Sequence, residues 1–152
     1  MPTDLDQVPA YSEFQKERIY VRREIHEKFG GQTQGGISTP KSVPVIFIFT
    51  GAAGKEHGYG YDGWIDERTF LYTGEGQPDS GHQRFVRGNK ALRDHRENNK
   101  RVYLFENLPK RGETAGKVRF KGELELIDYE VREQDSTGTP RRVIVFRFRR
   151  VD

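Results

Sequence analysis

The chain has 152 residues, of which 33% are hydrophobic and 32% charged, and its formal net charge is +3. This length suits one domain with a small core, so we expect residues 1–152 to form a single domain in which residues 1–11 are flexible. The lack of cysteine excludes disulfides and Cys-ligated metals. No apolar run is long enough for a membrane span or a secretory signal, so we expect a cytoplasmic protein without a membrane partner.

The first third of the chain predicts a helix, a loop and a buried strand. Over residues 12–29, Ile25 and Phe29 continue an apolar stripe, and Gly30 ends it, so we expect a helix. Residues 30–40 are rich in glycine and polar side chains, which predicts a loop. The run VPVIFIFT at residues 43–50 is almost entirely β-branched or aromatic, which predicts a strand buried on both faces.

Strands dominate the rest of the chain. We expect a hairpin within residues 59–73, a helix within 85–98 and a strand over 101–106. Residues 116–133 and 141–151 alternate apolar and polar side chains, and the turn DSTGTP joins them into an antiparallel hairpin. These elements predict a mainly β (α+β) fold with flanking helices, arranged as a small, twisted, partly closed β-barrel.

Basic side chains concentrate in two segments. Seven Lys and Arg residues lie within residues 84–101, and five arginines lie within 141–150. Such segments suit contacts with the phosphates of a nucleic acid. A solvated protein surface is the alternative, and charge alone favours it slightly.

The sequence contains no recognisable catalytic motif. The four histidines are scattered, without the HExxH spacing of a helical metal site or the paired histidines of an HNH nuclease. There is no GxSxG elbow and no phosphate-binding GxxxxGK[ST] loop. We therefore expect a protein that is not an enzyme and holds no metal or cofactor. A metal-dependent nuclease within this chain ranks last among the alternatives and predicts DNA cleavage with Mg²⁺ or Mn²⁺.

One constellation of aromatic and acidic residues suggests base recognition. Tyr59, Asp62 and Tyr72 flank the predicted hairpin, and a glycine-rich turn follows directly. Two aromatic rings can sandwich a flat base while a carboxylate accepts a hydrogen bond from its exocyclic amine, which is how one extruded nucleobase is held. The alternative is that Tyr72 belongs to the core and that Tyr59 and Asp62 are ordinary loop residues.

Three sequence motifs occur in an order typical of a known family. The motifs GGQTQGGIST, FLYTGEGQ and FVRGNKALRDH, together with Tyr59 and Asp62, resemble the SRA (SET- and RING-associated) domain. The resemblance is strongest to the SRA-like domains of bacterial, McrA-like HNH restriction endonucleases and covers roughly residues 25–106. It implies an SRA/PUA-like barrel that reads modified cytosine.

The resemblance also implies roles for individual residues. Tyr59 and Tyr72 would stack on the flipped base, and Asp62 would accept from the cytosine N4 amine, where thymine offers a carbonyl. The remaining expected site residues are Thr73 and Gly74 beside the base, Gln32, Thr33 and Gln34 in one DNA-probing loop, His82, Gln83 and Arg84 in a second and shorter one, and Arg87, Asn89, Lys90 and Arg93 at the phosphates.

The function that the resemblance implies is a DNA-binding module that recognises 5-methylcytosine or 5-hydroxymethylcytosine in duplex DNA by base flipping. It would be the specificity domain of a type IV, modification-dependent restriction endonuclease in the bacterial cytoplasm, with an HNH nuclease domain in the same full-length chain. The alternative is an RNA- or small-ligand-binding module on a related PUA-like barrel. That alternative predicts equal or better binding to RNA and no effect of cytosine modification.

Overall fold

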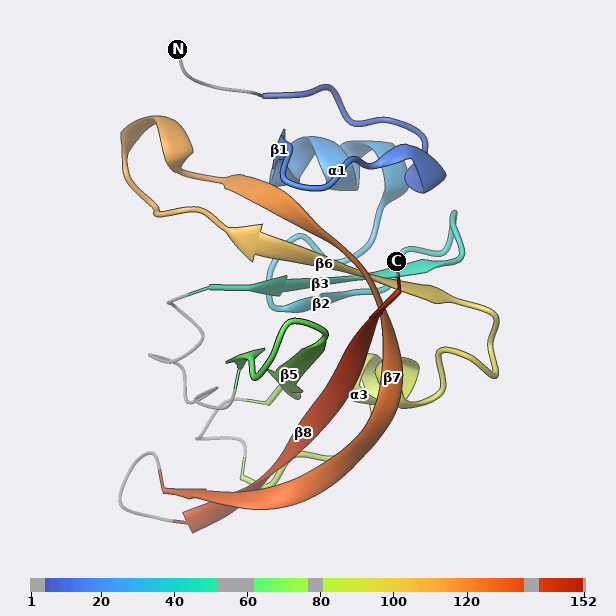
Figure 1. The fold of residues 1–152 in the computed structure, drawn as a ribbon, viewed down its shortest axis with the longest axis vertical. Coiled ribbons are helices and arrows are strands. Elements are labelled where there is room, and N and C mark those ends of the chain that lie inside the picture. Colours follow the sequence, from blue (N-terminus) through green and yellow to red (C-terminus); the bar gives the residue numbers. More distant parts are fainter. Residues whose placement is uncertain (1–4, 52–61, 77–80, 136–139, 152) are drawn as a thin grey trace.

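A long antiparallel hairpin dominates the computed structural model, which describes residues 5–51, 62–76, 81–135 and 140–151. Its strands are β7 (Lys117–Asp135) and β8 (Pro140–Val151), which pair along their length and curve around the molecule (Figure 1). The predicted hairpin is confirmed. Its turn, residues 136–139, lies outside the described residues.

The strands of the described ranges belong to one curved sheet. The order is β2-β3-β6-β7-β8-β5-β4, and β1 also pairs with β7. The strands besides the long hairpin are β1 (Ile19–Val21), β2 (Ile37–Ser38), β3 (Val45–Thr50), β4 (Gly63–Trp64), β5 (Thr69–Thr73) and β6 (Arg101–Asn107). Among the described residues the end strands β2 and β4 are not paired with each other, so the sheet curls but stays open. The predicted mainly β fold with flanking helices is confirmed.

Strand β3 is buried on both faces, as its apolar run predicts. It lies next to β6 in the parallel direction and to β2 in the antiparallel direction. Ile46 and Ile48 point into one hydrophobic cluster, and Phe47 and Phe49 point into a second one on the opposite face. A continuous apolar run is needed because both faces of the strand contribute to a core.

The helix predicted over residues 12–29 is wrong in its first half. The chain forms a 3-10 turn, η1 (Tyr11–Glu13), and then strand β1, and only α1 (Arg22–Phe29) is helical. Ile19–Val21 are β-branched or aromatic, and pairing with β7 buries Tyr20 almost completely. The predicted end is correct, because Gly30 has a positive φ of 85° after the last turn.

The second predicted helix is confirmed but shorter than the segment that contains it. Helix α3 (Arg87–Arg93) buries Leu92 against the sheet, and a short 3-10 turn, η3 (Gly112–Thr114), precedes β7. His95 follows α3 and is buried, and its Nε2 accepts the Leu126 N–H at 3.1 Å. No helix in the described ranges is long and apolar enough to span a membrane.

Candidate nucleic-acid interface

The carboxylate of Asp62 lies where the ends of three strands meet. Asp62 directly precedes β4, and its Oδ1 accepts the Thr73 N–H of β5 at 2.7 Å. Its Oδ2 accepts the Thr50 hydroxyl at the end of β3, at 3.2 Å. Burial raises the pKa of Asp62 to about 6, while the hydrogen bonds from Thr73 and Thr50 counteract that rise. Above pH 6 the site therefore presents a fixed, charged acceptor.

Thr73 and Gly74 continue β5 past this carboxylate. Thr73 is 3% exposed, and its hydroxyl has no hydrogen bond of standard geometry among the described residues. A Cβ at Gly74 would lie 2.7 Å from Asn89 Oδ1 and 2.9 Å from Gln83 Oε1, so any larger residue would displace these two side chains. The backbone of β5 is thus in close contact with its neighbours just beyond Asp62.

Tyr72 lies in the core. The residue is 4% exposed, its ring stacks near Phe70 at 6.5 Å between centroids, and its hydroxyl donates to the Phe49 carbonyl at 3.3 Å. The alternative interpretation, that Tyr72 is a core residue, therefore describes its position in this structure. Tyr59, the other expected stacking residue, lies outside the described residues.

A cavity of about 290 Å³ opens beside Asp62. Its volume is near the lower end of the range for small-ligand pockets. Its walls combine aromatic, aliphatic and polar side chains, from Thr50, Gly51, Asp62, Gly63, Trp64, Phe70, Leu104, Glu106 and Lys121. The predicted carboxylate therefore lies at a cavity whose walls are partly apolar and partly polar.

The first glycine-rich loop is tied down by its own side chains. Gln32 Oε1 accepts the Thr39 N–H at 2.7 Å, and Gln32 Nε2 donates to the Thr39 hydroxyl at 3.2 Å. Gly36 lies so close to Tyr72 that a Cβ at this position would collide with the Tyr72 hydroxyl. Thr33 and Gln34 at the tip are exposed.

The second predicted probing segment is bound to the sheet through two of its three residues. His82 Nδ1 accepts the Arg142 N–H at 2.8 Å. Gln83 Nε2 donates to the Gly74 carbonyl at 2.6 Å, and Gln83 Oε1 accepts the Ile144 N–H at 2.8 Å. Arg84 is exposed. In this structure Gln83 links β5 to β8.

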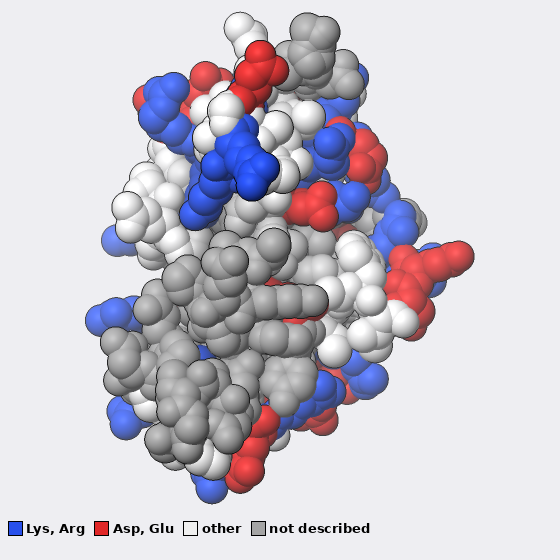
Figure 2. Space-filling model, turned by 90° about the vertical axis from the view of Figure 1, so that its left-hand side faces the viewer, with Lys and Arg blue, Asp and Glu red and all other residues white. Residues whose placement is uncertain are grey.

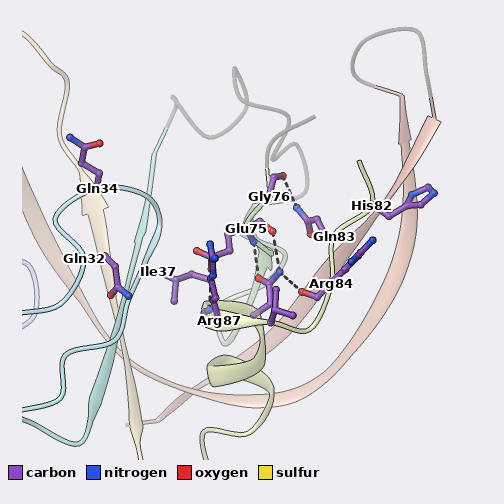
Figure 3. Close-up of a pocket in the computed structure, with 12 residues that line it drawn as sticks. Gln32, Gln34, Ile37, Glu75, Gly76, His82, Gln83, Arg84 and Arg87 are labelled. Carbon is purple, nitrogen blue, oxygen red and sulfur yellow. Dashed lines mark hydrogen bonds between the residues drawn. The ribbon is translucent and has the colours of Figure 1, made fainter. Parts of the chain in front are cut away.

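The two predicted probing segments face each other across a groove of about 860 Å³. Figure 3 shows Gln32 and Gln34 on one side and His82, Gln83 and Arg84 on the other. The groove is lined by Gln32, Gln34, Ile37, Glu75, Gly76, His82, Gln83, Arg84, Val86, Arg87, Gly88 and Asn89. Segments about 50 residues apart in the sequence are thus brought to one site.

The four expected phosphate ligands differ in accessibility. Arg87 and Lys90 are exposed, whereas Arg93 forms an ion pair with Asp94 at 2.8 Å. Asn89 is 1% exposed, and its amide bonds to the Glu75 N–H, the Glu75 carbonyl and the Arg84 carbonyl. This geometry gives Asn89 a positioning role between β5 and α3, and its phosphate contact stays a prediction.

Charge is mixed over much of the surface. The basic C-terminal strand is partly neutralised by β7, because Arg147 pairs with Asp128 and Arg149 with Glu125. Figure 2 shows basic and acidic side chains interspersed around the face it presents. In the described part of the chain, no group of three or more His, Asp and Glu side chains is placed to hold a metal ion.

The sequence motifs did not indicate two residues that the structure places at the candidate interface, Glu75 and Arg22. Glu75 Oε2 accepts the Gly88 N–H at 3.0 Å on the groove floor, and burial raises the pKa of this carboxyl. Arg22 contacts the first glycine-rich loop from α1. A signal for Arg22 was present, because it occupies the apolar face of the helix, three and seven residues before Ile25 and Phe29.

The comparison with protein families identifies the class. Residues 16–152 match the family described as "ScoMcrA-like, SRA domain", so the chain belongs to this family of SRA domains. Among curated protein sequences none matches it significantly.

Solved structures share the fold. A structure of the sulfur binding and SRA domains of ScoMcrA, complexed with phosphorothioated DNA, has a TM-score of 0.68 at 19% identity over 91% of this chain and 40% of that one. The DNA recognition domain of the cytosine modification-dependent restriction endonuclease LpnPI has a TM-score of 0.67 at 16% identity, covering 90% and 73% of the two chains. A complex of the SUVH5 SRA domain with methylated CHH DNA has a TM-score of 0.62 at 22% identity, covering 91% and 86%. The chain thus spans well under half of that ScoMcrA chain.

Proposed function

We propose that this SRA domain binds duplex DNA and recognises a 5-modified cytosine, 5-methylcytosine or 5-hydroxymethylcytosine, that is flipped out of the helix. The observation that carries the proposal is Asp62, a largely buried carboxylate that is held by Thr73 and Thr50. It lies beside a cavity whose lining includes the rings of Trp64 and Phe70. An acceptor at this place suits the N4 amine of cytosine and rejects thymine, which has a carbonyl there.

The groove between the two predicted probing segments offers a surface for contact with a duplex. The loop that carries Gln34 and the segment that carries Arg84 flank it, and the exposed cations Arg87 and Lys90 belong to the adjoining helix. Arginine and lysine side chains at such a site add a salt-dependent attraction to phosphates. Since Tyr72 is 4% exposed, stacking on its ring requires that face to open when the base enters.

The free energy gained by stacking can offset the cost of extruding the base, and burial of the C5 substituent adds little to it. Extruding a paired base costs a few kcal/mol, and stacking on an aromatic ring returns about 1–3 kcal/mol per base. Burying one methyl group adds less than about 1 kcal/mol. We therefore expect a moderate preference for the modified base.

We further propose that the domain supplies specificity to a modification-dependent restriction endonuclease of the bacterial cytoplasm, with an HNH nuclease domain in the same full-length chain. Support comes from the family match and from restriction endonucleases with the same fold. The DNA-binding domain itself is not an enzyme in this proposal, and it needs no cofactor.

The test is a fluorescence-anisotropy titration at near-physiological salt. The ligands are one duplex with cytosine, 5-methylcytosine or 5-hydroxymethylcytosine at a single position, and a matched RNA. Tighter binding to a modified duplex is expected and identifies the mark. Equal binding to all three duplexes would refute the proposal, and a preference for RNA would favour the alternative RNA-binding module.

A further inference from the structure

A half-buried arginine supports the first glycine-rich loop. Arg22, the first residue of α1, donates through Nη2 to the Gly35 carbonyl at 2.9 Å and to the Gln32 carbonyl at 3.4 Å. Its guanidinium carbon lies 3.7 Å from the centre of the Phe49 ring, and its Nε donates to His26 Nε2 at 3.0 Å. The guanidinium therefore joins the loop, the helix and β3.

This arrangement is unusual for a residue that only stabilises the fold. Burial lowers the pKa of Arg22 to about 10, so the side chain stays charged at neutral pH. In the described ranges no carboxylate forms an ion pair with it. Its partners are backbone carbonyls, an aromatic face and an imidazole nitrogen, and the Tyr72 phenol interacts with it electrostatically. Burying a cation among neutral groups costs stability. A role in holding the loop accounts for that cost.

The loop presents only some of its side chains. Both Gln32 and Gln34 are exposed, but the Gln32 amide is bonded to Thr39. Gln34 stands at the tip and projects from the loop in Figure 3. The far end of the loop is fixed as well, since the Gly36 carbonyl accepts the Phe49 N–H at 2.8 Å. A loop held at both ends loses less conformational entropy when it binds.

We propose that Arg22 is a positioning residue that holds the loop of residues 31–36 so that Gln34, and not Gln32, enters the duplex where the base is extruded. This inference rests on the base-flipping function proposed above. It makes Gln34 the side chain that fills the vacated space, and Arg22 acts on the DNA only through the loop.

The test compares two duplexes that differ in the cost of base extrusion. The first has 5-methylcytosine, or the mark that the wild type prefers, opposite guanine and beside 2-aminopurine, whose fluorescence rises on unstacking. The second has the same target opposite an abasic site, so that no base pair must break. The variants are Arg22→Met and Gln34→Ala. Their controls are Arg23→Met, on the exposed Arg23 that pairs with Glu27 at 3.0 Å, and Gln7→Ala, on an exposed glutamine outside the loop.

We expect Arg22→Met and Gln34→Ala to weaken binding to the paired duplex by roughly tenfold and to reduce the fluorescence rise, with less than about a threefold change for the abasic duplex. The two controls should bind both duplexes like the wild type. Gln34 is exposed, so its variant carries the test even if Arg22→Met does not fold.

Three results would overturn the inference, and they are distinguishable. Wild-type affinity of both variants for the paired duplex refutes the loop assignment alone. An equal loss for both duplexes makes Arg22 a residue of the pocket or fold rather than of the loop. No fluorescence rise with the wild-type protein refutes base flipping itself, and the assignment of Arg22 and Gln34 falls with it.

Discussion

Replacing Asp62 by Asn should stabilise the protein while it removes the charged acceptor on which base recognition depends. Asn keeps a carbonyl oxygen for the Thr73 N–H, which Asp62 accepts at 2.7 Å, but it carries no charge to bury. Burial raises the pKa of Asp62 from 3.8 to about 6. At 1.36 kcal/mol per pKa unit, this rise corresponds to a cost of up to about 3 kcal/mol of folding free energy at neutral pH.

The raised pKa of Asp62 also determines how the unfolding free energy changes with pH. Because the folded protein binds the proton on Asp62 more tightly than the unfolded chain does, this group lowers the unfolding free energy as the pH rises from about 4 to 6. Above pH 6 the full cost is present. The advantage of Asp62→Asn should therefore be largest at pH 7 and should vanish near pH 4.

The assay is urea unfolding of both proteins between pH 4 and 7.5. A stabilisation of about 1–3 kcal/mol corresponds to a rise in melting temperature of roughly 2–10 °C for a domain of this size. Asp66→Asn is the matched control. Hydrogen bonds from Arg68 and Thr69 lower the pKa of the exposed Asp66, so its replacement should not stabilise the protein at neutral pH. Destabilisation by Asp62→Asn at pH 7, or a gain that does not change with pH, would refute the reasoning.

Two further predictions concern DNA binding, and one concerns stability. The preference for modified cytosine should weaken as the pH falls below about 6, because protonation of Asp62 neutralises the charged acceptor. Titrations at pH 5 and 7.5 check this, and Asp62→Asn should show no such trend. Asn89→Ala should lower the unfolding free energy by about 1–3 kcal/mol, since three buried hydrogen bonds to Glu75 and Arg84 are lost, and thermal unfolding measures it. Lys90→Ala should weaken binding to all duplexes alike and reduce the slope of log K against log salt by about 1, with the preference for modification unchanged.

Much of the sheet was predictable because its strands carry strong local patterns. The alternation in β7 and β8 predicts their hairpin, and the apolar run of β3 predicts burial on both faces. The structure of the segment before α1 was not predictable, because its apolar residues fit a helical stripe and a short strand equally well. Pairing with β7, more than 95 residues away, decides for the strand at Ile19–Val21.

The site was predictable in position but not in detail. The structure brings Asp62 against Thr73 and the two predicted probing segments to one groove, and the roles of these residues at DNA stay predictions. The sequence could not tell that Gln83 and Asn89, which are polar residues in a basic segment, bond to the backbone of other elements. Such contacts depend on tertiary distances: Gln83 reaches Ile144 across 61 positions of the chain. The role of Tyr59 stays a prediction.

The end of β3 connects the two charged groups to which this site owes its proposed chemistry. Thr50 donates its hydroxyl to Asp62, and the preceding residue, Phe49, lies under the Arg22 guanidinium and accepts the Tyr72 hydroxyl through its carbonyl. Both charges are at least partly buried and are held by neutral groups, so each lowers stability. In our proposals Asp62 recognises the base, and Arg22 positions the loop. A shift of Phe49 and Thr50 at the end of β3 would therefore disturb the acceptor and the loop together.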